Sequence, residues 1–288
     1  MIGEVLSYEF MQRALVAAVL VGGVAPTVGA HLVQRRLSLV GDGLGHVALA
    51  GAAIGILTGT APVLTALVVA VIGALAVELV RLKARSGGDV ALALLFYGGI
   101  ALGVVLISRA PTGKAVNLDS YLFGSVTSTS STDVITFAVL SFAVLAVTVG
   151  FGRYLLAAGV DERYAKAAGL PVVPANLALA VTTAVTVVVS MRVDGLLLIS
   201  ALMVVPVVAA QQLVSGFWRT MAVASLIGAL ASVVGVFGAY EADTPSGATI
   251  VLITISIFAI ALVMNSLRSS LATRRTRRLL RGETDRVS

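Results

Sequence analysis

The chain has 288 residues, of which 58% are hydrophobic and only 12% are charged, and its mean hydropathy is +1.04. An average soluble domain carries about 25% charged residues, so this composition excludes a soluble globular protein. The sequence contains no cysteine, which excludes disulfide frameworks, thiolate nucleophiles and cysteine-ligated metals. Any metal chemistry must therefore use histidine and carboxylate side chains.

A membrane-spanning helix needs about 20 mostly apolar residues, and nine stretches of the sequence meet this requirement. In chain order they are residues 12–34, 38–58, 62–82, 90–108, 133–152, 174–191, 195–215, 220–240 and 248–267. Glu4 and Glu9 stand before the first stretch in place of a basic run, so it is predicted to be a true span and not a signal peptide. The predicted fold class is all-α, a polytopic membrane protein with about nine transmembrane helices.

Basic residues fall in every second connection between the predicted spans, and such connections face the cytoplasm. They are Arg35, Arg36, Arg81, Lys83, Arg85, Arg153, Arg163, Lys166 and Arg219, with Arg109, Lys114 and Arg192 as exceptions on the other side. The pattern predicts an outer N-terminus and an inner C-terminus. Residues 1–267 are predicted to form the transmembrane domain, and residues 268–288 a basic cytoplasmic tail that anchors the topology and does not bind nucleic acid.

Small residues recur at four-residue spacing in the second span, at Gly41 with Gly45 and at Gly51, Gly55 and Gly59. Close approach of backbones through small residues drives helix association in lipid. The second span is therefore predicted to lie inside the protein.

Asp42 and His46 are ionisable residues in this second span, where such a group costs about 2.5 to 3.5 kcal/mol on insertion scales. Their four-residue spacing places them on one helix face. Carboxylate and imidazole together suit Zn²⁺, Mn²⁺ or Fe²⁺, and a second copy related by a two-fold axis would bring four ligands together. His46 must be neutral to bind a metal, so ion passage should weaken below about pH 6.5. An equally weighted alternative is a hydrogen-bonded Asp–His pair at the cytoplasmic helix end.

Three further ionisable groups have simpler interpretations. Glu78 stands three residues before Arg81, which predicts an ion pair that reaches the membrane interface, with a place on the ion path as the less favoured alternative. His31 has no carboxylate at helical spacing and is predicted to form an interfacial hydrogen bond. Asp194 is predicted to lie at the interface too.

A short cytoplasmic helix is predicted within residues 159–171. Asp161 is expected to cap its N-terminus, Gly169 to take the left-handed conformation after its last turn, and Pro171 to stop it. A helix this short is marginal in water, so it must pack on the membrane domain or on a cytoplasmic partner subunit.

No phosphate-binding GxxxxGK[ST] motif is present, and residues 111–114 lack its first glycine and its Ser/Thr. The chain is therefore predicted not to be an enzyme, and any ATP hydrolysis that drives it belongs to a separate chain.

Four segments resemble the membrane permease subunits of ABC importers for zinc, manganese and iron, over about residues 10 to 265. They are the stretch from Arg35 and Arg36 through Gly-Asp42 to His46; Tyr121-Leu-Phe-Gly124 with Asp133; Asp161 with Ala165, Gly169, Leu170 and Pro171; and Asp243-Thr-Pro245-Ser-Gly247. The third segment is similar to the family's cytoplasmic coupling helix.

The resemblance implies a homodimeric pore in the plasma membrane, ATPase subunits docked on the coupling helices, and an extracytoplasmic metal-binding protein. It also places Asp42 and His46 on the ion path, with the divalent metal as the substrate and no permanently bound cofactor. Gly43 and Gly45 depart from the family's Ala and Ser, and Glu162 and Arg163 depart from its frequent proline and acid. Two alternatives remain, a proton-coupled secondary metal transporter and a permease for iron chelates or cobalamin.

Overall fold

The computed structural model describes residues 7–83, 88–109, 130–191 and 198–287, together with Gly124 and Gly195. All regular structure within these ranges is α-helical. The helices are α2 (Glu9–Gln34), α3 (Val40–Thr58), α4 (Pro62–Lys83), α5 (Gly88–Ile107), α7 (Ser131–Gly150), α8 (Gly152–Val160), α9 (Glu162–Ala167), α10 (Val172–Met191), α11 (Ile199–Leu213), α12 (Phe217–Ala242) and α13 (Ser246–Val287).

Each of the nine predicted spans coincides with one helix, which confirms the all-α membrane fold. Seven helices are long and apolar enough to cross a membrane, whereas the apolar part of α5, Leu92–Ile107, and the whole of α11 are shorter. The prediction of residues 195–215 is too long, because the α11 helix covers only 15 residues. At 1.5 Å per residue this is about 22 Å, less than the hydrocarbon thickness of about 30 Å.

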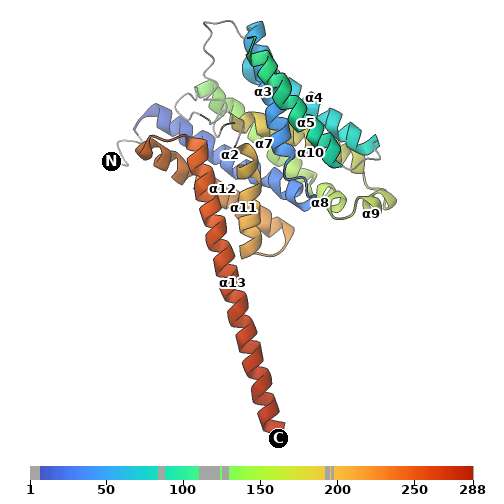
Figure 1. Ribbon diagram of the computed structural model, residues 1–288, viewed down its shortest axis with the longest axis vertical. Helices are drawn as coiled ribbons and strands as arrows, with labels where there is room; N and C mark the ends of the chain where they lie inside the picture. The colour runs from blue at the N-terminus through green and yellow to red at the C-terminus, as the bar shows by residue number, and fades with distance from the viewer. Residues whose placement is uncertain are drawn as a thin grey trace.

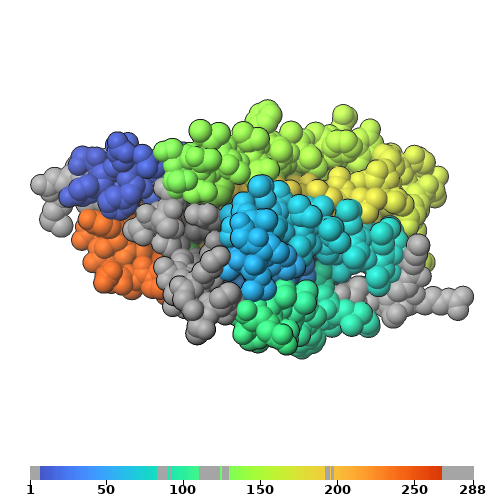
Figure 2. Space-filling model, turned by 90° about the horizontal axis from the view of Figure 1, so that it is seen from above, coloured from blue at the N-terminus to red at the C-terminus, as the bar shows by residue number. Residues whose placement is uncertain are grey.

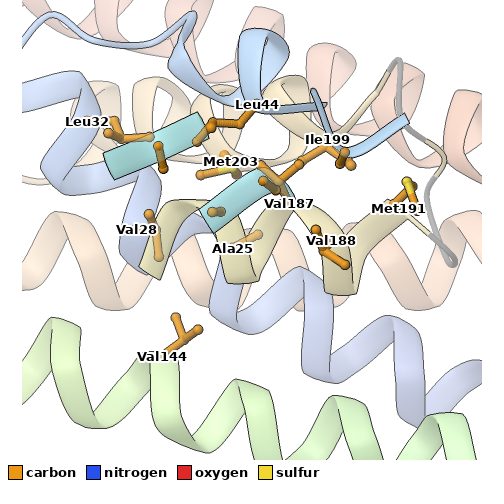
Figure 3. Close-up of a cluster of buried hydrophobic side chains, with 14 of the residues drawn as sticks. Ala25, Val28, Leu32, Leu44, Val144, Val187, Val188, Met191, Ile199 and Met203 are labelled. Atoms are coloured by element: carbon orange, nitrogen blue, oxygen red, sulfur yellow. The ribbon is translucent and has the colours of Figure 1, made fainter. Parts of the chain in front are cut away.

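The helices α2 and α10 each pack on several other helices, and α3, α4 and α5 form a block on one side of the bundle (Figures 1 and 2). The largest buried cluster draws its residues from several helices (Figure 3). It includes Ala25, Val28 and Leu32 of α2, Leu44 of α3, Val144 of α7, Val187, Val188 and Met191 of α10, and Ile199 and Met203 of α11. The face of α3 that carries Leu44 is therefore held firmly by the core.

Glycines let the helices of this block approach closely. A Cβ added to Gly51 of α3 would stand 2.7 Å from Ala66 Cα of α4, and one added to Gly99 of α5 would stand 2.9 Å from Val47 N of α3. No side chain fits at such distances, so α3 contacts both neighbours backbone to backbone. The predicted interior position of the second span is confirmed.

Two short helices follow α7, of which only α9 is predicted from the sequence. The chain turns at Phe151 and forms α8 before Asp161 starts α9. Ala158 of α8, Ala165 of α9 and Val172 of α10 are buried against one another. The two short helices therefore form an elbow that packs on the membrane domain.

The ends of the helices sort into two groups. Arg35 at the end of α2 donates a hydrogen bond to Asn176 near the start of α10 and another to Leu155 O of α8, so these segments share one end of the molecule. At the opposite end, Phe10 of α2 contacts Tyr240 of α12. This arrangement places the predicted basic connections on one side and the start of the chain on the other.

The last helix, α13, continues without a break from Ser246 to Val287 and extends beyond the bundle (Figure 1). Its apolar part ends at Leu267, where the last predicted span ends. The functional division into a domain of residues 1–267 and a tail of residues 268–288 stays a prediction.

Candidate ion path and coupling helix

Asp42 lies in the first turn of α3, where the positive end of the helix dipole favours a carboxylate. His46 follows one turn later, so the two side chains share a face of the helix. Both residues are half-buried, whereas Gly41, Gly43, Leu44 and the intervening Gly45 are buried. The two ionisable side chains therefore emerge on the one face of this turn that the rest of the chain leaves partly open.

The neighbouring positions of this turn are occupied by other helices. Gly41 faces Ser200 and Met203 of α11, and Gly43 faces Leu95 of α5. The His46 ring meets the Phe96 ring edge-on, with centroids 4.8 Å apart. A Cβ on Gly99 would lie 3.0 Å from the carbonyl carbon of His46. The α5 helix thus fixes the backbone of His46 and orients its ring.

No hydrogen bond or ion pair joins Asp42 or His46 to another residue in the part of the chain that the structure describes. Within the same residues, no group of three or more His, Cys, Asp or Glu side chains could hold a metal ion. The predicted alternative of a hydrogen-bonded Asp–His pair is therefore not found among the described residues. The described residues of one copy offer two ligands here, which is fewer than a tetrahedral site needs.

Glu78 is buried, with 7% of its surface exposed. Arg81 Nε donates to Glu78 Oε2 at 2.8 Å, and Arg81 Nη2 donates to Oε1 at 2.7 Å. The predicted ion pair is confirmed, and helix packing covers its carboxylate. Its predicted position at the membrane interface stays a prediction. Both carboxylate oxygens are engaged by Arg81, which argues against Glu78 as a ligand for a passing cation.

His31 is also buried, at 2% exposure, and its predicted place at the membrane interface stays a prediction. Its Nε2 lies 3.4 Å from Thr148 O of α7, and its ring lies 4.8 Å from the ring of Phe217 of α12. His31 therefore joins three helices inside the bundle. The predicted interfacial residue Asp194 lies outside the described residues.

The ends of α9 are built as predicted. The Asp161 carboxylate accepts a hydrogen bond from Tyr164 N at 2.9 Å, which is an N-cap. Gly169 takes φ +75°, and Leu170 N donates to Ala165 O across it, as expected for a glycine that ends a helix. The chain then enters α10 directly after Pro171. The predicted role of this helix in coupling to an ATPase stays a prediction.

The α9 helix has a buried side and an open side. Ala165 is fully buried against the domain, whereas Tyr164 is 73% exposed and Arg163 is exposed beside it. Partial burial alone would raise the pKa of the Glu162 carboxyl. The hydrogen bond from Lys166 and the charges of Arg81, Lys166 and Arg35 outweigh burial and hold that pKa below its usual range. Ala165 therefore anchors the helix, and the exposed residues form the surface available to a partner.

The other segments that carry the resemblance are placed in part. Residues 121–123 lie outside the described ranges. Asp133 forms a capping box with Ser130 at the start of α7. Asp243 ends α12 in the left-handed conformation, with φ +51°, and borders a cavity of about 360 Å³ with Phe10 and Tyr240. These two aspartates therefore shape helix ends on the side opposite α9.

Sequence reasoning missed Phe96 and Asn176. Nothing in the spacing of α5 connects Phe96 with His46, and Asn176 meets Arg35 across 141 positions of sequence. The signal available was the rarity of an amide side chain in an apolar span, because a buried polar group requires a partner.

The family comparison decides the class of the protein. The ABC 3 transport family matches residues 7–265. The chain belongs to the ABC 3 transport family. The chain is 32% identical over 258 residues to the manganese transport system membrane protein MntC of Halalkalibacterium halodurans, covering 90% of this chain and 88% of that one. It is 30% identical over 269 residues to the chelated iron transport system membrane protein YfeD of Yersinia pestis, covering 93% and 90%.

A solved structure, PsaBC from Streptococcus pneumoniae in complex with Fab, superposes with a TM-score of 0.81 at 30% identity. The superposition covers 91% of this chain and 95% of that chain. As a member of the ABC 3 transport family, the chain is a multi-pass permease subunit of the plasma membrane. It works with ATP-binding partner subunits, which hydrolyse the ATP. The resemblance drawn from the sequence motifs is confirmed.

Proposed function

We propose that this ABC 3 permease carries divalent transition-metal ions inward, and that Asp42 and His46 bind the ion briefly as it passes. Manganese, iron and zinc are the candidate ions. The support is the position of the two side chains, which are half-buried on one face of α3 and have no hydrogen-bonding or ionic partner among the described residues. Relatives named for manganese and chelated iron transport favour the same class of cargo.

Two copies of the chain are proposed to form the path together. One copy supplies one carboxylate and one imidazole, so a second copy across a two-fold axis would complete a set of four ligands. Transport requires that binding be weak enough for release, and a site divided between two moving copies meets this requirement. Docked ATPase subunits would close on α9, the two copies would rock, and access would alternate between the two sides of the membrane. An extracytoplasmic metal-binding protein would deliver the ion.

Family membership decides against the alternative of a proton-coupled secondary transporter. The structure adds a physical reason, because such a transporter needs paired ionisable groups on a proton path. Glu78 is bound to Arg81 through both oxygens. Of the described acidic and histidine residues of the predicted spans, this leaves only Asp42 and His46 unpaired, and both lie on one helix, whereas a proton path needs such groups on several helices.

The test is metal uptake by the complete transporter in vesicles, measured separately for Mn²⁺, Fe²⁺ and Zn²⁺. The Asp42→Ala/His46→Ala variant should lose uptake and still assemble with its ATPase. Glu241→Gln is the matched control, since Glu241 is exposed at the opposite end of the molecule, and it should transport normally. Normal uptake by the Asp42/His46 variant would refute the site, and uptake without ATP would refute the mechanism.

A further inference from the structure

Arg81 at the end of α4 contacts two carboxylates that belong to different helices. Two of its nitrogens bind Glu78 within α4, and its third, Nη1, lies 3.6 Å from Glu162 Oε2 of α9. The other described ion pairs, such as that between Lys166 and Glu162, stay within one helix. The Arg81–Glu162 pair is therefore the one ionic connection between helices in the described part of the chain.

Glu78 fixes the direction in which Arg81 points. The guanidinium is planar and its five donors have a fixed geometry, so two parallel hydrogen bonds to one carboxylate determine where the remaining nitrogen lies. Glu78 is itself buried by helix packing. Arg81 consequently presents Nη1 to α9 from a rigid base, and does so better than a free surface arginine would.

Arg35 attaches the other side of the same elbow. Its guanidinium donates to Asn176 Oδ1 of α10 and to Leu155 O of α8, the latter at 3.1 Å. The elbow formed by α8 and α9 is therefore joined to α2 and α10 through Arg35 and to α4 through Arg81. The attachment through Arg81 leads to α4 and the attachment through Asn176 leads to α10, and both α4 and α10 pack on α3.

The α4 helix is in direct contact with the candidate ion path. A Cβ on Gly73 of α4 would lie 2.9 Å from the side chain of Val47, the residue that follows His46. A cavity of about 60 Å³ is lined by Arg81 and Glu78 of α4 and by Leu44 of α3. Close-packed interiors transmit displacement, and this cavity leaves space for α4 to shift relative to α3.

We propose that Arg81 and Glu162 are positioning residues that transmit a displacement of α9 to α4, and through α4 to the face of α3 that carries Asp42 and His46. This inference rests on the proposed function. The α9 helix keeps its own fold through the Asp161 cap and buried Ala165. Removing the charge of Glu162 should therefore release α4 from α9 without unfolding either helix.

The experiment measures Mn²⁺ uptake and ATP hydrolysis together in vesicles that contain the complete transporter. Glu162→Gln should lower the amount of Mn²⁺ imported per ATP at least threefold, while assembly and ATP hydrolysis stay within twofold of the wild type. Glu9→Gln is the matched control, because it removes an exposed ion pair of α2 with Arg13 at the opposite end of the molecule and keeps Glu162 and Arg81 in place. It should leave the ratio unchanged. The double variant Glu78→Gln/Arg81→Gln removes both charges of the buried pair together, and it should reproduce the loss seen with Glu162→Gln.

A second readout needs no metal. The wild-type chain has no cysteine, so Leu57→Cys places a single thiol at a half-buried position of α3. ATP should change its rate of thiol labelling, and Glu162→Gln should abolish that change while Glu9→Gln keeps it. An unchanged import ratio or an unchanged ATP response in Glu162→Gln would overturn the inference, as would an equal loss in Glu9→Gln. If the wild type imports none of the three metals but its thiol responds to ATP through Glu162, the proposed cargo is wrong and the inference stands.

Discussion

The elbow end of the molecule and the start of α3 differ in whether their charged groups have partners within the chain. At the elbow end, Arg35, Glu78, Arg81 and Glu162 all have hydrogen-bonding or ionic partners within the chain. At the start of α3, Asp42 in the first turn and His46 one turn later have none among the described residues. A charge taken out of water without a partner is costly, so the first region is complete in one chain, whereas the half-buried pair of the second region is open to a ligand or to another subunit. The contrast separates a structural ion-pair network from the site that is proposed to bind the passing ion.

The largest stability effect is expected at the buried ion pair. Glu78→Ala leaves Arg81 without its main partner and should lower the free energy of unfolding by about 3 kcal/mol. Glu9→Ala removes an exposed ion pair with Arg13 that also lies within one helix. It should lower the free energy of unfolding by less than about 0.5 kcal/mol. Thermal unfolding of the detergent-purified chain measures both, and equal effects would contradict the assigned burial of Glu78.

A second prediction concerns the packing of α5 on His46. Gly99→Ala places a methyl group within 3.0 Å of the α3 backbone, so it should cost about 2 kcal/mol and reduce metal uptake. Gly98 has no atom within 4 Å of an added Cβ, so Gly98→Ala should leave uptake unchanged and stabilise α5 by about 0.5 kcal/mol. Similar uptake in the two variants would show that α5 does not position His46.

Loss of the N-cap of α9 is expected to have a smaller effect on stability. Asp161→Ala removes the acceptor for Tyr164 N and should lower stability by about 1 kcal/mol, whereas Asp161→Asn keeps an acceptor and should change it little. Co-purification of the ATPase should follow the same order. A loss of ATPase binding in Asp161→Asn equal to that in Asp161→Ala would indicate that the charge of Asp161, and not the helix start, matters to the partner.

The smallest effect is expected from pH at the Arg81–Glu162 pair. The pKa of Glu162 lies below its ordinary value of 4.5, so its charge contributes to stability at every pH above that value and is lost only as pH falls further. Between pH 5 and pH 8, the difference in melting temperature between the wild type and Glu162→Gln should therefore stay constant. A difference that disappears on going from pH 8 to pH 5 would contradict the assigned environment of Glu162.

Much of this fold can be predicted from local patterns in the sequence. Apolar length predicts the nine spans, because lipid requires helices whose backbone groups are satisfied internally. The start and end of α9 follow from Asp161 and Gly169, since caps depend on neighbouring backbone alone. The four-residue spacing of Asp42 and His46 predicts their common face in the same way.

Contacts between distant residues could not be predicted in this manner. The α8 helix starts at Gly152 with no polar break after α7, so residues 133–152 read as one continuous span. The burial of Glu78 and His31 depends on which helices cover them, which single-helix periodicity does not determine. Arg81 already has a local partner in Glu78, and Glu162 has one in Lys166. The sequence therefore gives no sign that Arg81 also contacts Glu162.

The most direct measurement asks whether the open face of α3 meets the same face of a second copy. In the otherwise cysteine-free chain, Asp42→Cys should be joined to the same position of the second copy by a short bifunctional thiol reagent in the assembled transporter. Leu64 of α4 is 62% exposed, and Leu64→Cys should not be cross-linked. Cross-linked copies at position 42 alone are the predicted result, and cross-linking through position 64 without any through position 42 would contradict the shared ion path.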